Sequence, residues 1–148
     1  CKTCHPNQTA MFEGTGYNVP SLKLAARVPC EGCHQAETET ISVPTRNSCK
    51  FCHETGDYPA IMEAWQTKTR GALSELKTAE GKAASLLATL NVPEARTLYE
   101  SAQKDINFVQ GDASFGVHNP ELTDILLKNA RERLQRCLDL LSQAIRKK

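Results

Sequence analysis

Three copies of one short motif, Cys-x-x-Cys-His, constrain this 148-residue chain more than any other feature. In chain order they are Cys1-Lys-Thr-Cys4-His5, Cys30-Glu-Gly-Cys33-His34 and Cys49-Lys-Phe-Cys52-His53, here called the first, second and third motifs. The chain has seven cysteines and four histidines, so the motifs use six of the cysteines and three of the histidines. Scarce residues at three identical offsets indicate a common chemical role.

The motif is the attachment signal for c-type haem. Two intervening residues let both sulfurs form thioether bonds to the vinyl carbons of one porphyrin, and the next histidine then points at the iron. The sequence therefore predicts three covalently bound haem c groups. Their attachment sites are Cys1, Cys4, Cys30, Cys33, Cys49 and Cys52, and their proximal iron ligands are His5, His34 and His53.

Three other uses of paired cysteines fit less well. Six cysteines of a secreted chain can form a disulfide framework, and paired cysteines can hold structural zinc. Neither requires a histidine directly after every second cysteine. A thioredoxin-like redox motif needs one pair beside a βαβ pattern, and no such pattern is present. Haem attachment is the interpretation that accounts for the histidines.

The pattern of residues along the chain changes near residue 57. Residues 1–57 contain all three motifs, many turn-forming residues and little periodicity. A loop-rich segment of this length has too little apolar bulk to fold alone, so we expect haems to supply it. Residues 58–148 show apolar residues at helical spacing. We predict a trihaem-binding segment over 1–57, and over 58–148 a helical region that packs on the haems and supplies a distal ligand.

The helical part divides into three predicted helices. The first spans residues 59–90 and the second spans residues 93–110. After a loop over residues 111–119, Asn119 caps the third helix and Pro120 occupies its first position. The predicted fold is mostly α: a loop-rich trihaem segment is followed by an antiparallel helical hairpin or three-helix region, with almost no strand.

The histidines do not fill all the axial positions of three haems. Three irons have six such positions, and the motifs supply three ligands. His118 is the one histidine outside a motif. Its place in a loop between two helices suits a rigid distal haem ligand, and this is the predicted role. The alternative is a loop histidine that only helps to cap the third helix.

Two axial positions remain without a histidine. Met11 and Met62 are candidate thioether ligands, although each also fits a packing role. The amine of Cys1, Cys137 or a lysine is a further option, with a buried structural thiol as the expected role of Cys137. Because the chain opens directly on Cys1, we expect upstream residues, including a secretion signal, and favour ligands from there or from another chain. An open position would instead bind a small molecule.

The stretch from Asp112 to Ala130, with its Gly-Val-His118-Asn-Pro loop, resembles the C-terminal part of multihaem cytochromes. The similar proteins are the pentahaem nitrite reductases and the octahaem nitrite and tetrathionate reductases. In that group a Gly-x-His-Asn-Pro loop lies between long helices, and its histidine is a distal haem ligand. The resemblance implies the same role for His118. It does not extend to the catalytic haem, because the chain has no Cys-x-x-Cys-Lys motif.

Electron transfer is the predicted function. Three haems attached within the first 53 residues must lie close together, and closely spaced haems pass electrons rapidly. We expect an electron carrier or a subunit of a redox complex rather than an enzyme. The alternatives are a small-molecule reductase, which would act on a nitrogen or sulfur oxyanion or a peroxide at one open haem, and a haem-bearing sensor or assembly module.

The predicted haem groups and the net charge of the chain also indicate where the protein is located and what it binds. Covalent haem attachment implies assembly outside the cytoplasm, so we expect a periplasmic or extracellular protein of a bacterium or archaeon. The expected partners are redox proteins, with other cytochrome subunits or upstream sequence as sources of axial ligands. A net charge of +1 indicates no nucleic acid. No apolar run approaches the roughly 20 residues of a transmembrane helix.

Overall fold

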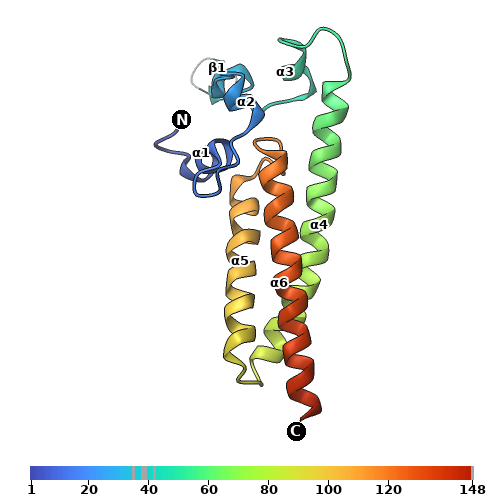
Figure 1. Ribbon diagram of the computed structural model, residues 1–148. Helices are drawn as coiled ribbons and strands as arrows, with labels where there is room; N and C mark the ends of the chain where they lie inside the picture. Colours follow the sequence, from blue (N-terminus) through green and yellow to red (C-terminus); the bar gives the residue numbers. More distant parts are fainter. Residues whose placement is uncertain (35, 38–39, 42, 148) are drawn as a thin grey trace.

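Three long helices form most of the molecule (Figure 1). They are α4 (Tyr58–Leu87), α5 (Pro93–Asp112) and α6 (Pro120–Arg146), which run in alternating directions as a three-helix region. The computed structural model describes residues 1–34, 36–37, 40–41 and 43–147. The fold is therefore mostly α, as the sequence predicts.

Local signals explain where the long helices begin. Asp57 Oδ1 accepts the amide of Ala60 at 3.2 Å and caps α4, whose second residue is Pro59. Asn119 Oδ1 accepts the amide of Leu122 at 3.1 Å and caps α6, whose first residue is Pro120. The predicted start of the third helix is thus confirmed. At 30 residues α4 is about 45 Å long.

The core lies along α6, which packs against both α5 and α4. Its apolar residues recur every three or four positions, so they form one stripe that faces the other two helices. Burying each large apolar side chain contributes about 1.5–3 kcal/mol. The buried stripe consists of Leu122, Leu126, Leu127, Ala130, Leu134, Cys137 and Leu141. Cys137 is a fully buried thiol within this core, and burial raises its pKa.

The N-terminal segment contains short helices where the sequence indicated mainly loops. They are α1 (Pro6–Glu13), α2 (Leu22–Ala25), the 3-10 helix η1 (Cys30–Gly32) and α3 (Arg46–Lys50). A two-residue antiparallel pair, β1 (Ala36–Glu37) with β2 (Thr40–Ile41), is the strand structure among the described residues. Elements this short do not repeat an apolar pattern, which is why periodicity did not reveal them.

Asn119 joins this N-terminal segment to the helical bundle. Besides capping α6, its side-chain amide donates hydrogen bonds to the carbonyls of Met11, at 3.1 Å, and Val19, at 2.6 Å. Asn119 is 1% exposed and the Met11 side chain is fully buried beside it. One buried side chain therefore sets the start of α6 and the position of the chain around α1.

Asn119→Ala should lower the free energy of unfolding by about 2–4 kcal/mol, because it removes a helix cap and takes the Asn119 donor from the carbonyl of Val19. The carbonyl of Met11 keeps the amide of Gly14 as a donor, at 3.3 Å. Asn119→Ser should cost less, since a serine hydroxyl can still cap α6. The measurement is urea denaturation followed by helical circular dichroism. Asn107→Ala, at an exposed position of α5, is the control; an equal loss in Asn119→Ala and this control would contradict the assigned role.

Candidate haem sites

Each Cys-x-x-Cys-His motif folds into a single helical turn. The amide of each histidine donates a hydrogen bond to the carbonyl of the first cysteine of its own motif, at 2.9, 2.8 and 3.0 Å for the first, second and third motifs. Residues three and four apart lie on the same face of such a turn. Both sulfurs and the imidazole of each motif therefore project from one side, which is the arrangement that haem attachment needs.

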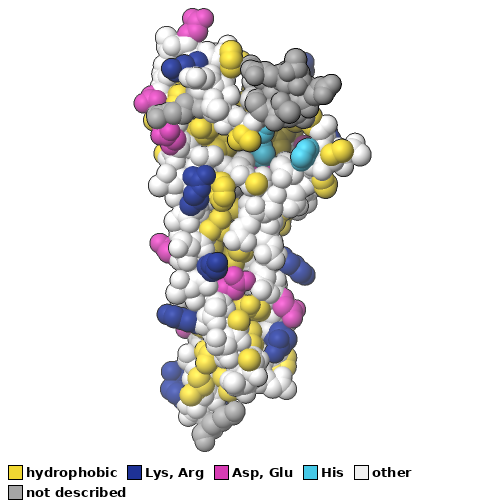
Figure 2. Space-filling model, turned by 180° about the vertical axis from the view of Figure 1, so that it is seen from behind, with side chains coloured by type: hydrophobic (Ala, Val, Ile, Leu, Met, Phe, Trp, Pro, Cys, Tyr) yellow, Lys and Arg dark blue, Asp and Glu magenta, His cyan; other side chains and the backbone are white. Residues whose placement is uncertain are grey.

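The three motifs lie at one end of the molecule, around α1, α2 and α3 (Figure 1). The thiol of Cys1 in the first motif donates to Glu31 Oε1 in the second, at 3.5 Å. Burial raises the pKa of Cys33 in the second motif, and Cys49 of the third motif raises it further. The first and second motifs are thus in contact, and the third motif lies within electrostatic range of the second. Figure 2 shows histidine side chains gathered at this end of the molecule.

His118 lies opposite a motif histidine. The ring centroids of His118 and His34 are 6.0 Å apart, with 40° between the ring planes. A metal about 2.0–2.1 Å from an imidazole nitrogen lies about 3 Å from the ring centroid, so two rings on opposite sides of one iron have centroids about 6 Å apart. The observed spacing fits an iron between His34 and His118.

A buried carboxylate orients the His118 ring. Nδ1 of His118 lies 2.6 Å from Oδ1 of Asp112, which is 2% exposed. A carboxylate can only accept, so Nδ1 carries the hydrogen and the lone pair of Nε2 is left available for a metal. Metal-binding histidines commonly have such a partner on the other ring nitrogen. The backbone amide of His118 also donates to Ser114 Oγ, at 3.0 Å.

The loop that carries His118 has several residues with positive φ, and contacts from α4 and α2 hold it. Ala113, Phe115 and Gly116 all have positive φ, at 59°, 54° and 93°. Such residues persist where the surroundings enforce the conformation. On the α4 side, Gln66 Nε2 donates to the carbonyl of Ser114 at 3.3 Å. The Arg70 guanidinium lies 4.3 Å from the centroid of the Phe115 ring.

Lys23, in α2, also holds this loop. Its ammonium group donates to the carbonyl of Val117 at 2.6 Å and lies 5.0 Å from the centroid of the Trp65 ring. Burial lowers the pKa of Lys23, and Cys33 and Cys49 act in the opposite direction. Sequence reasoning missed this residue, since a single lysine between two leucines carries no motif.

Two further candidate ligands occupy different environments. Met11 is fully buried in the core, and its sulfur accepts the Thr123 hydroxyl at 3.9 Å. This position fits the packing role. Met62 lies in α4, three residues before Trp65, and therefore shares the helix face that meets Lys23. Ligation by either methionine stays a prediction.

The third motif contacts the start of α4. The His53 ring stacks on the Tyr58 ring, with centroids 3.6 Å apart and 16° between the planes. Tyr58 is the first residue of α4, so this contact joins the motif to the bundle. His5 is exposed and directly precedes α1. The structure thus brings His34 and His118 together, while His5 and His53 have no second histidine opposite them among the described residues.

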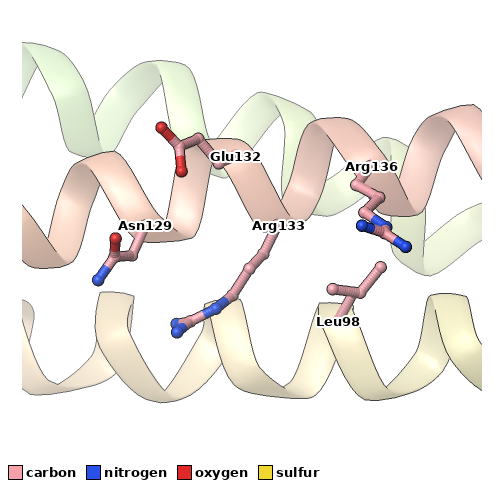
Figure 3. A pocket seen from close by; sticks show the side chains of 5 residues that line it. All are labelled: Leu98, Asn129, Glu132, Arg133 and Arg136. Carbon is pink, nitrogen blue, oxygen red and sulfur yellow. The ribbon is translucent and has the colours of Figure 1, made fainter.

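The surface hollow between α5 and α6 is a different kind of feature (Figure 3). Its arginines are paired: Arg133 with Asp105, and Arg136 with Glu94 at 3.0 Å. Burial raises the pKa of Asp105, and Arg133 opposes that rise. The hollow carries no motif residue and lies on the long helices, so it is not part of the candidate haem sites.

Comparison with solved structures finds a protein that shares this fold. One solved structure to which the chain is similar is the crystal structure of outer cell wall cytochrome OcwA, with a TM-score of 0.72 and 24% identity. The match covers 90% of this chain and 34% of that one, so the chain spans about a third of the length of the larger protein. The sequence matches no protein-family model and no curated protein.

The similarity to OcwA is one of fold. It shows that part of that larger protein has the same fold as 90% of this chain. The predicted resemblance to the nitrite reductase group stays a prediction.

Gly116→Ala should lower the free energy of unfolding by about 1–3 kcal/mol, because Gly116 has a φ of 93° and an added Cβ would lie 2.8 Å from Thr69 Oγ1. Gly71→Ala is the matched control. A Cβ at Gly71, inside α4, would meet no atom within 4 Å, so this change should stabilise by about 0.5–1 kcal/mol. Chemical denaturation measures both changes in the free energy of unfolding. Equal changes in the two variants would contradict the described conformation of the loop at Gly116.

Proposed function

We propose that the chain is a trihaem c-type cytochrome that transfers electrons through closely packed haems. The observation that carries the proposal is the shared geometry of the three motifs, each one helical turn with both cysteines and the histidine on one side. Contacts between the motifs support close packing of the haems. When bound, each haem iron alternates between the ferric and ferrous states and so carries one electron.

In this proposal His34 and His118 would hold the iron of the second-motif haem. The 6.0 Å ring spacing and the Asp112 hydrogen bond support this pairing. Contacts from α2 and α4 restrict the His118 loop, so the ligand would change position little between oxidation states. A fixed ligand set favours rapid electron transfer.

His5 and His53 would be the proximal ligands of the other two haems. Their distal ligands would come from Met62, from Met11, from upstream sequence or from another cytochrome subunit. The proposed domains are a trihaem-binding segment over 1–57 and a helical region over 58–148 that supplies His118. In the structure, α4 begins at Tyr58, directly after the proposed boundary.

The proposed location is the periplasm or the cell exterior, and the proposed partners are redox proteins. Covalent haem attachment supports the location, as does the fold shared with an outer cell wall cytochrome. No helix in the described part of the chain combines the length and apolar character that a membrane span needs.

The holoprotein should contain three covalent haems. Changing both cysteines of any one motif to alanine should remove one haem and leave two, because each motif attaches its own group. Intact-protein mass spectrometry and the optical spectrum of the haem measure this count. Cys137→Ala is the control and should retain all three haems, since its thiol lies in the core. A holoprotein with fewer than three haems would disprove the proposal.

His118→Ala should convert one low-spin haem to a high-spin haem and leave the spectra of the other two unchanged. Electron paramagnetic resonance resolves the change. The same substitution in a Cys30→Ala, Cys33→Ala background should produce no new high-spin haem, because the haem that His118 binds is then missing. A high-spin signal in that background would assign His118 to another motif. A haem of the unaltered protein that is high-spin and binds cyanide would favour the reductase alternative.

A further inference from the structure

Lys23, in α2, is held by groups other than carboxylates. Among the described residues no carboxylate pairs with it, whereas Lys2 pairs with Glu13 and Lys68 pairs with Asp124, both at 2.5 Å. Its partners are the carbonyl of Val117 and the face of the Trp65 ring. A carbonyl and an aromatic face both favour a positive charge without neutralising it.

The carbonyl of Val117 and the ring of Trp65 set the position of this charge. Lys23 is electrostatically coupled to Cys33 in one motif and to Cys49 in the other. Its carbonyl partner belongs to Val117, the residue before His118. The charge therefore lies beside the loop that supplies a proposed iron ligand, and within electrostatic range of cysteines in two motifs.

A charge in this place acts strongly on a redox group. Lys23 is half-buried, and pairs of charges near a protein surface interact several times more strongly than in bulk water. A ferric haem carries one more positive charge than a ferrous haem. A nearby cation therefore disfavours the ferric state and makes the haem easier to reduce.

We propose that Lys23 is a positioning and tuning residue that holds a positive charge at the His118 loop, near the second and third motifs, and raises the reduction potentials of the haems attached there. This inference rests on the proposed trihaem function and adds a specific role for α2. The hydrogen bond from Lys23 to the carbonyl of Val117, here called the tether, also restrains the His118 loop. Substitutions of Lys23 can remove the charge and the tether separately.

The test compares three substitutions in the holoprotein, measured by optical redox titration of all three haems. Lys23→Met removes both the charge and the tether. Lys23→Gln removes the charge but keeps a donor for the carbonyl of Val117. Lys23→Arg keeps the charge. The expected result is that Lys23→Met and Lys23→Gln lower the summed midpoint potentials, with two haems affected, while Lys23→Arg leaves the sum unchanged.

Lys82→Met is the matched control, because it removes an exposed charge on α4. Lys82 follows Trp65 by 17 residues, about 25 Å along the helix axis, which is more than the screening length of about 10 Å at 0.1 M salt. It should shift no potential. The proposal would be overturned if Lys23→Gln left the summed midpoint potentials unchanged. It would also be overturned if Lys23→Arg lowered that sum as much as Lys23→Gln does.

The two proposals fail in different ways. Lys23 variants with three low-spin haems and unaltered potentials would exclude the tuning role and leave the trihaem function in place. A holoprotein without three covalent haems would remove the function itself. Because Lys23→Gln retains a hydrogen-bond donor, the charge can be tested even if Lys23→Met disturbs folding.

Discussion

The buried amide of Asn119 is the interaction on which the rest of the structure depends. One side chain caps α6 and donates to two carbonyls of the N-terminal segment, those of Met11 and Val19. Loss of the donor to the carbonyl of Val19 would cost about 1–3 kcal/mol, so the motif-bearing segment is restrained at this junction. The helical bundle thereby acts as a rigid base on which the short N-terminal elements are arranged.

The same junction determines the electrostatics of the proposed haem sites. His118 precedes Asn119 directly, and the buried carboxylate of Asp112 holds its ring, whose centroid lies 6.0 Å from that of His34. Lys23 brings a positive charge to the same loop. One negative and one positive group therefore contact a single loop. In the proposed cytochrome, Asp112 would strengthen His118 as an iron ligand and Lys23 would favour the reduced state.

Much of the bundle was predictable because its helices are long and amphipathic. The start of α6 followed from Asn119 and Pro120, and the buried stripe followed from residues such as Leu126 and Leu134. The short helices of the N-terminal segment were not predictable in this way, since four to eight residues do not repeat a pattern. Lys23 was missed for a related reason: its role depends on Trp65 and Val117, which are far from it in sequence.

The sequence by itself determined the chemistry of the motifs, because sulfur and imidazole at fixed short offsets form a site within one helical turn. It also determined which residues face the core of the long helices. Only the tertiary structure decided that His118 lies opposite His34 rather than beside the other motif histidines. That pairing depends on how α4, α5 and α6 pack and where Asn119 joins them to α1, and such long-range geometry is not encoded in local spacing.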